Sequence, residues 1–136
     1  MNTISTKAHH HLNHTITLLK WTYGLAAIII GADKFFHFLT DWDKYLSPLI
    51  AQFLPSVHQG MMAIGVLEIA VGVILLSSLT RLGAYFVALW FFMIAGDLIS
   101  MHAFYDIALR DIVLGVGALA LGRLISLRKE LAAQPR

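Results

Sequence analysis

Long apolar runs, each interrupted by a few charged residues, dominate the pattern of hydrophobic and polar positions along the chain. Four runs, at about residues 17–39, 59–79, 82–102 and 106–126, are long enough for membrane-spanning helices, which need roughly 20 residues each. Between the first two, residues 41–54 place apolar side chains at helical spacing but are too short to span. The pattern therefore predicts an all-α fold: an integral membrane four-helix bundle with a short amphipathic interfacial helix between the first and second spans.

The two ends of the chain are polar and frame this membrane domain. We predict a polar, histidine-containing N-terminal tail over residues 1–15, a membrane domain over 16–129 and a C-terminal tail over 130–136. Within the N-terminal tail, His10 and His14 are four positions apart, so on a helix they would share one face and could bind a metal ion. A solvated tail is the alternative interpretation of such a biased segment.

Composition agrees with a membrane protein and narrows the classes of partner. Of 136 residues, 58% are hydrophobic and 13% are charged, whereas soluble domains carry about 25% charged residues. The formal net charge of +2 is small and its carriers are scattered, so we expect no nucleic-acid partner. There is no cysteine, which excludes disulfides, thiolate metal sites and iron–sulfur clusters within this sequence.

The lysines and arginines predict how the spans are oriented. Seven of the ten lie near the two termini or in the turn between the second and third spans, and three lie toward the opposite side. Cytoplasmic segments carry the excess of basic residues in membrane proteins. We therefore predict that the N- and C-termini are both cytoplasmic.

Ionisable side chains inside the predicted spans lie in the same half of those spans. Each such group costs roughly 2.5–3.5 kcal/mol on insertion scales, so it needs polar neighbours. At about 1.5 Å per helical residue, all of them except the interfacial lysines and arginines fall in the half of the bilayer away from the termini. We therefore predict one intramembrane polar pocket that opens on the outer side. Its expected residues are Asp33, Lys34, His37, Glu68, Asp97, Arg110 and Asp111.

Further polar residues follow or precede these spans at their outer ends. The residues expected at the mouth of the pocket are His58, His102, Tyr105 and Asp106. The pocket holds more carboxyl groups than basic ones, and a buried carboxylate without a partner tends to be protonated. We expect this of Glu68 in particular, because it lies deepest; a cation, a protonated histidine or a ligand could supply the missing charge instead. Gly65 and Gly72 share its helix face, which predicts a close helix contact there.

Two other interpretations of these charges remain open at this point. The charges can form a purely structural network that fixes how the helices pair. They can also bind a metal ion, but no paired histidine motif lies within a helix at this depth, so we predict no metal site there. We expect no covalently attached cofactor, and we expect any bound molecule to be a quinone or a lipid. The residues alone assign no catalytic role.

Four stretches together carry a recognisable family pattern. They are GADKFFHFLTDWDKYLSP at residues 31–48, LEIAVG at 67–72, YDIALRDIVL at 105–114 and GALALGRL at 117–124. In these stretches, and in its span pattern over nearly all of residues 17–125, the chain resembles the DoxX-like family of small four-helix integral membrane proteins. The resemblance implies a multi-pass protein of a bacterial or archaeal cytoplasmic membrane, of a kind often associated with oxidoreductase systems.

The resemblance favours one function among three. It implies an accessory subunit of a membrane, quinone-linked oxidoreductase system, with the lipid bilayer and an oxidoreductase or further copies of the chain as partners. The outer polar pocket is equally typical of a carrier for protons, cations or a small solute. The small-residue pairs along the spans are also typical of a structural subunit of a larger membrane complex. Whether the chain is an enzyme is not determined by these features.

Overall fold

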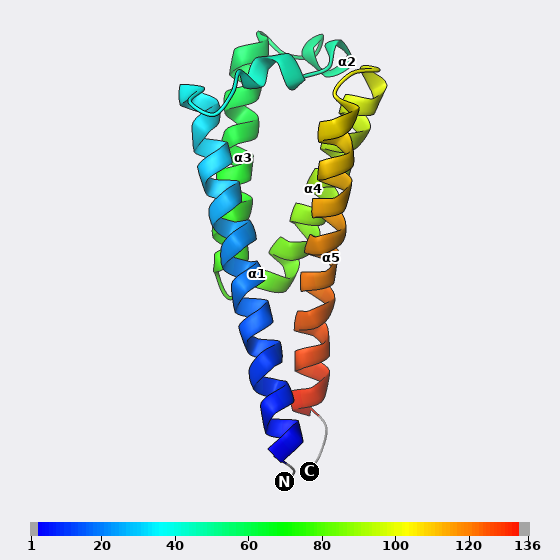
Figure 1. Ribbon diagram of the computed structural model, residues 1–136. Helices are drawn as coiled ribbons and strands as arrows, with labels where there is room; N and C mark the ends of the chain where they lie inside the picture. The colour runs from blue at the N-terminus through cyan, green and yellow to red at the C-terminus, as the bar shows by residue number, and fades with distance from the viewer. Residues whose placement is uncertain (1–2, 134–136) are drawn as a thin grey trace.

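The computed structural model describes residues 3–133, and over that range the chain is helical, with no strand (Figure 1). This confirms the all-α prediction. Four helices are long, and two short helical segments connect the first of them to the second. In chain order the elements are α1 (Thr3–Phe36), the 3-10 helix η1 (Trp42–Tyr45), α2 (Pro48–Ala51), α3 (Val57–Leu76), α4 (Thr80–Ser100) and α5 (Tyr105–Ala133).

The long helices form two pairs, and the first pair is α1 with α3 (Figure 1). Glycines bring the two backbones together: a Cβ atom added at Gly65 would lie 2.5 Å from the carbonyl oxygen of Gly31, and one added at Gly72 would lie 2.8 Å from that of Gly24. Gly65, Glu68 and Gly72 are all buried. The predicted close helix contact on this face of α3 is therefore confirmed.

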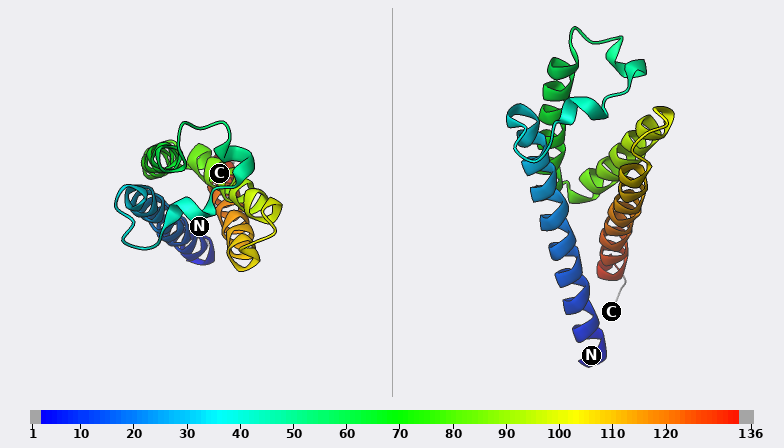
Figure 2. Two further views of the ribbon diagram at one scale, coloured as in Figure 1. Left: turned by 90° about the horizontal axis from the view of Figure 1, so that it is seen from above. Right: turned by 45° about the horizontal axis from the view of Figure 1, so that its top comes forward.

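The second pair is α4 with α5, and it uses glycines differently. Gly115 and Gly122 on α5 leave room for two aromatic rings of α4, those of Phe92 and Tyr85. Seen in Figures 1 and 2, the two pairs lie close together near the α3–α4 turn and diverge toward the connection between α1 and α3. Near the turn, a buried apolar core joins them, made of Ile16, Leu75, Ala84, Val87, Ala88, Ala118, Leu121 and Ile125.

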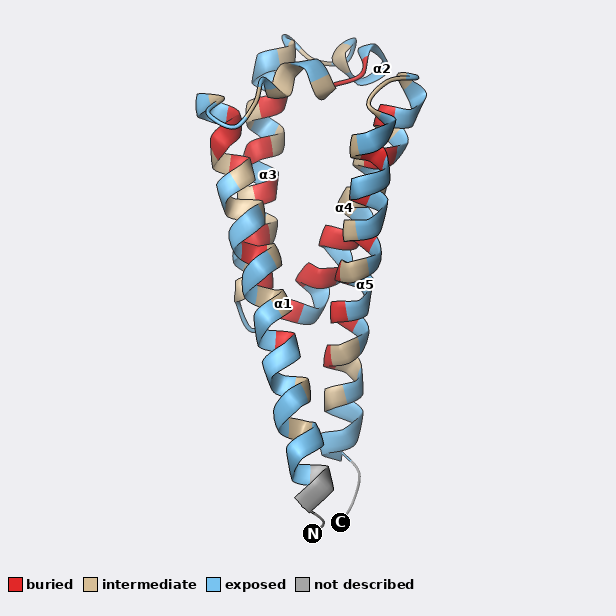
Figure 3. Ribbon diagram, in the orientation of Figure 1, coloured by how far each residue is buried: buried red, intermediate tan, exposed pale blue. Residues whose placement is uncertain are grey.

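The outward faces of the helices are exposed and apolar, the reverse of a soluble protein. Figure 3 shows the buried positions on the faces between helices and the exposed ones around the outside. Many of the exposed residues are large and hydrophobic, such as Ile29 on α1, Val73 on α3 and Leu89 on α4. Three helical stretches are long and apolar enough to cross a membrane: Thr6–Phe36, Val57–Leu76 and Thr80–Ser100. The chain is therefore built as a multi-pass membrane protein.

The connection between α1 and α3, residues 37–56, is called the cap segment below. We expected one amphipathic helix over residues 41–54, and this is wrong: η1 and α2 are separate four-residue pieces. The break lies at Ser47, whose ψ of 148° is extended, as expected for a residue before proline. Pro48 then begins α2, and the Ser47 hydroxyl accepts a hydrogen bond from the amide of Ile50.

The ends of all four long helices differ from the expected spans, most of all in α1 and α5. Residues 3–15 continue α1 as a helix instead of forming a separate tail, and α5 likewise continues through Ala133. At its other end α1 stops at Phe36 and not at 39. The reason is His37, whose φ of 55° is left-handed and ends the helix, a position usually taken by glycine or asparagine. Residues 1–2 and 134–136 of the predicted tails lie outside the described range.

Candidate functional site: a capped cavity between the helix pairs

A cavity of about 760 Å³ lies between the two helix pairs, and all four long helices and the cap segment line it. Its wall is mostly apolar, with a small number of polar side chains. The cap segment contributes Trp42, Tyr45 and Leu46, among others. Of the seven residues expected in the polar pocket, five line this cavity: Lys34, Glu68, Asp97, Arg110 and Asp111.

Lys34 and Glu68 form a buried ion pair in the cavity wall. The Lys34 Nζ donates to Glu68 Oε2 at 2.6 Å, and both side chains are less than a tenth exposed. Trp90 Nε1 donates to the other carboxylate oxygen at 3.2 Å. The Lys34 ammonium also lies 4.1 Å from the ring centroid of Trp42, which is cation–π range. Glu68 therefore has two polar partners, where the sequence suggested that it would lack one.

Asp97 and Ser47 connect the cap segment to α4. The Asp97 carboxylate accepts hydrogen bonds from the backbone amide of Ser47, at 3.2 Å, and from its hydroxyl. Ser47 is almost completely buried. Because Ser47 is also the N-cap of α2, this contact holds the middle of the cap segment against the second helix pair.

Arg110 and Asp111 are neighbours in sequence and pair with each other on α5. Nε and an Nη atom of Arg110 donate to Asp111 Oδ1 at 3.2 and 3.1 Å. The two side chains differ greatly in burial, at 61% exposed for Arg110 and 3% for Asp111. The guanidinium therefore pairs with a buried carboxylate while it stays largely exposed itself.

Asp33 does not line the cavity but anchors the start of the cap segment. Its carboxylate accepts hydrogen bonds from the amides of Phe38 and Leu39, at 2.9 and 3.0 Å, and from Trp42 Nε1 at 2.7 Å. Backbone amides outside a helix or strand need other acceptors, and here one buried side chain supplies two of them. The indole that stacks on Lys34 is thus held by the residue that precedes Lys34.

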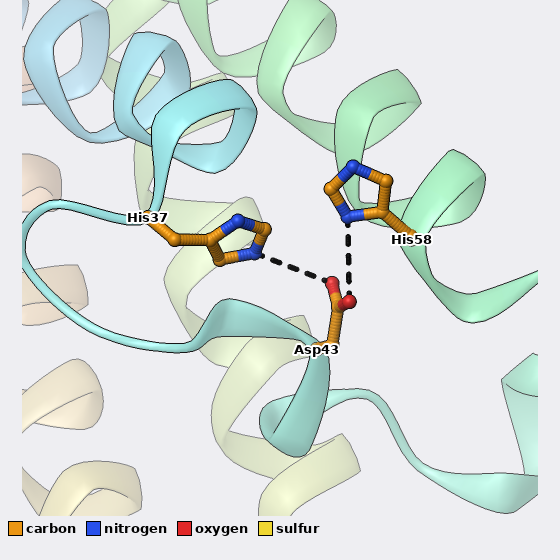
Figure 4. A group of neighbouring side chains, drawn as sticks. All are labelled: His37, Asp43 and His58. Carbon is orange, nitrogen blue, oxygen red and sulfur yellow. Dashed lines mark ion pairs between the residues drawn. The ribbon is translucent and has the colours of Figure 1, made fainter.

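His37 also lies outside the cavity lining, in a second cluster where α1 and α3 meet the cap segment. Its Nε2 atom is 3.5 Å from Oδ1 of Asp43, and Nδ1 of His58 is 3.3 Å from Oδ2 of the same carboxylate (Figure 4). The two imidazole rings are stacked with centroids 5.1 Å apart. His58, expected at the mouth of the pocket, therefore belongs with His37, and Asp43 completes the group.

The other residues expected at the mouth lie at the α4–α5 connection. His102 Nδ1 and the Tyr105 hydroxyl are 3.3 Å apart, and both side chains are exposed. Asp106 is exposed in the first turn of α5. None of these three residues is in the cavity lining.

Several residues of the site were not singled out from the sequence. Ser47 and Asp43 have ordinary sequence surroundings for a loop, and only the fold brings them to Asp97 and to the histidines. Only Trp90 could have been found from the sequence. A buried indole N–H usually donates to a polar group, and Glu68 lies on a neighbouring span to accept from it. Tyr23 follows the same rule: its hydroxyl donates to the carbonyl of Leu114 at 2.7 Å, joining α1 to α5.

Comparison of the chain with family models, with curated proteins and with solved structures finds no match.

Proposed function

We propose that the protein is a four-span membrane protein of the DoxX-like type whose cavity binds an amphipathic small molecule with a hydrogen-bonding head group, a quinone by preference. In this proposal it serves a membrane oxidoreductase system as an accessory subunit. The observation that carries the proposal is the cavity itself: about 760 Å³ of largely apolar space with a few polar side chains in its wall. Ligand sites are typically of this size and composition.

Three observations support α5 as the fourth span. Its outward face is exposed and apolar from Leu109 through Val113 and Val116, as expected for a face in contact with lipid. In Figure 1 the first turns of α1 and the last turns of α5 lie at the same end of the molecule, as an even number of crossings requires. The charged residues of α5 support the same arrangement, because Asp111 is buried in the bundle and Arg110 lies at the cavity.

The polar groups of the cavity suit a carbonyl-bearing head group. A quinone oxygen is a hydrogen-bond acceptor and therefore needs donors. Lys34 has three N–H donors, of which Glu68 takes one. Arg110 has five, of which Asp111 takes two. These two cations come from opposite helix pairs, and both line the cavity.

The far end of the cavity favours a binding site over a conduit. Toward the α3–α4 turn, the buried apolar core around Leu75, Val87 and Leu121 fills the space between the helix pairs. A carrier for protons or cations needs polar steps through this region, and the core supplies only aliphatic side chains. An apolar ligand tail, in contrast, can make favourable van der Waals contacts with such a surface.

The cavity tryptophans provide a direct binding test. Two of the three tryptophans, Trp42 and Trp90, line the cavity, whereas Trp21 is about half exposed on α1. Titrating the detergent-solubilised protein with a short-chain quinone should quench the fluorescence of the two cavity indoles. Trp90→Phe and Trp42→Phe should each lose part of the saturable quenching, and Trp21→Phe should keep it.

A second measurement is organic extraction of the purified protein followed by mass spectrometry for quinones. Quenching that does not saturate, or that disappears equally in Trp21→Phe, together with the absence of extractable quinone, would overturn the proposal. A lipid recovered at one molecule per chain would replace the quinone by a lipid as the ligand.

A further inference from the structure

The cluster of His37, Asp43 and His58 lies outside the cavity and has a geometry of its own. The three residues come from three separate places: His37 follows α1, Asp43 is in η1, and His58 is in the first turn of α3. One potential ligand atom from each lies within 4.8 Å of the other two (Figure 4). No other group of this kind, with three or more histidine or acidic residues, occurs in the part of the chain that the structure describes.

Two atoms in the cluster are buried and lack hydrogen-bond partners. They are Nε2 of His37 and Oδ1 of Asp43, which face each other at 3.5 Å. Buried polar atoms without partners are rare in native proteins, so each such pair needs an explanation. A cation between the two atoms would satisfy both at once.

The distances in the cluster are short enough for its three residues to bind one tetrahedral metal ion. With metal–ligand bonds of about 2.0–2.1 Å, neighbouring ligand atoms around a tetrahedral centre lie roughly 3.3 Å apart. The separations are 3.5 Å from Asp43 Oδ1 to His37 Nε2 and 3.3 Å from Asp43 Oδ2 to His58 Nδ1, and one ligand atom from each residue lies within 4.8 Å of the other two. Those separations are too long for strong hydrogen bonds but fit ligands that share one ion.

We propose that His37, Asp43 and His58 form a three-ligand binding site for a divalent transition-metal ion, with Zn²⁺ as the best fit. Two imidazole nitrogens and one carboxylate oxygen form a donor set that Zn²⁺ commonly takes. The His58 side chain is 46% exposed, which leaves the fourth position open to water or to an external ligand. The same set binds Co²⁺ in similar geometry, which provides a spectroscopic probe.

The site also has a structural consequence for the cap segment. Asp43 directly follows Trp42, whose indole covers Lys34 in the cavity wall. A metal ion bound to Asp43 and to the ends of α1 and α3 would hold η1 in this position. The proposal does not depend on what the cavity binds, because none of the three metal ligands lines it.

The test must first remove competing histidines. Of the seven histidines, four lie at positions 9–14, where His10 and His14 have ring nitrogens 3.2 Å apart. These four are changed to glutamine in the full-length chain, which is purified without a polyhistidine tag. Isothermal titration with Zn²⁺ should then show one bound ion per chain. Co²⁺ should give the visible absorption of a four- or five-coordinate centre and not that of the hexa-aqua ion.

Single substitutions in this background test the individual ligands. Asp43→Asn, His58→Ala and His37→Gly should each weaken Zn²⁺ binding at least about tenfold. The matched control is His102→Gly. The backbone of His102 is left-handed like that of His37, with φ values of 52° and 55°, but His102 is not in the cluster. His102→Gly should bind Zn²⁺ as the background does.

The outcomes are decisive in both directions. One ion per chain, lost with the cluster substitutions and kept with His102→Gly, supports the site. Absence of Zn²⁺ binding in the background, or equal loss in His37→Gly and His102→Gly, overturns it. If a cluster variant does not fold, the Co²⁺ spectrum of the background protein still decides, because a purely hexa-aqua spectrum contradicts the site.

Discussion

Lys34 and Glu68 form a buried ion pair, 2.6 Å between Nζ and Oε2, that joins α1 to α3 inside the cavity wall. The pair lies just beyond the Gly31–Gly65 contact, where the two helices approach most closely. Trp42 and Trp90 complete its surroundings, one from the cap segment and one from the second helix pair. The ion pair and the two indoles therefore connect α1, α3, α4 and the cap segment, which together with α5 surround the cavity.

Removing one member of this pair should destabilise the protein strongly. Glu68→Ala leaves the Lys34 ammonium buried without its counter-charge, for which we expect a loss of about 3–5 kcal/mol. The double variant Lys34→Met/Glu68→Leu removes both charges and should lose much less. The measurement is the free energy of unfolding by denaturing detergent, followed by circular dichroism.

Lys20→Met is the control for this prediction. Lys20 is also on α1, but it donates to the carbonyl of Ser77 at 3.3 Å in an exposed position. We expect a change below about 1 kcal/mol. Losses that simply add in the Lys34/Glu68 double variant would show that the two residues act independently.

The glycine contact between α1 and α3 should be intolerant of a methyl group. Gly65→Ala places a Cβ 2.5 Å from the carbonyl oxygen of Gly31, so the helices must separate. We expect a loss of about 1–3 kcal/mol in the free energy of unfolding. Gly96→Ala is the matched control, because a Cβ at Gly96 meets no atom within 4 Å. It should be neutral or stabilising by up to about 1 kcal/mol.

Asp33 should control the mobility of the cap segment. Asp33→Ala removes the acceptor of two backbone amides and of the Trp42 indole. We expect a loss of about 1.5–3 kcal/mol and faster hydrogen exchange at Phe38 and Leu39. Trp42→Phe removes only the indole donor, so these two amides should stay protected. Equal exchange in both variants would contradict the role assigned to the carboxylate.

The absence of cysteine makes the topology easy to test. Gln52 in the cap segment and Ser78 in the α3–α4 turn are both exposed, at opposite ends of α3. In intact cells, a membrane-impermeant thiol reagent should label Gln52→Cys and should label Ser78→Cys only after permeabilisation. Labelling of both in intact cells, or of Ser78→Cys alone, would reject the proposed orientation.

The sequence by itself predicted where along each helix the polar groups lie. Apolar run length predicted the long helices, and counting residues from a span end placed Asp97 and Asp111 at similar depth, with Glu68 the deepest of the three. Small residues at helical spacing predicted the contact face of α3, because Gly65 and Gly72 allow a close approach whatever helix lies opposite. The position of a residue along its helix and the set of residues on one helix face depend only on the sequence of that helix. They can therefore be predicted without knowing how the helices pack.

Only the tertiary structure decided which groups meet. Lys34 pairs with Glu68 because α1 packs on α3, and Asp97 meets Ser47 because the cap segment reaches the other helix pair. His37 points to Asp43 and away from the cavity because its left-handed backbone ends α1 one turn earlier than the apolar pattern suggested. Contacts between residues far apart in sequence depend on the rotation and pairing of helices and on the path of a loop. None of these leaves a periodic signal in the sequence.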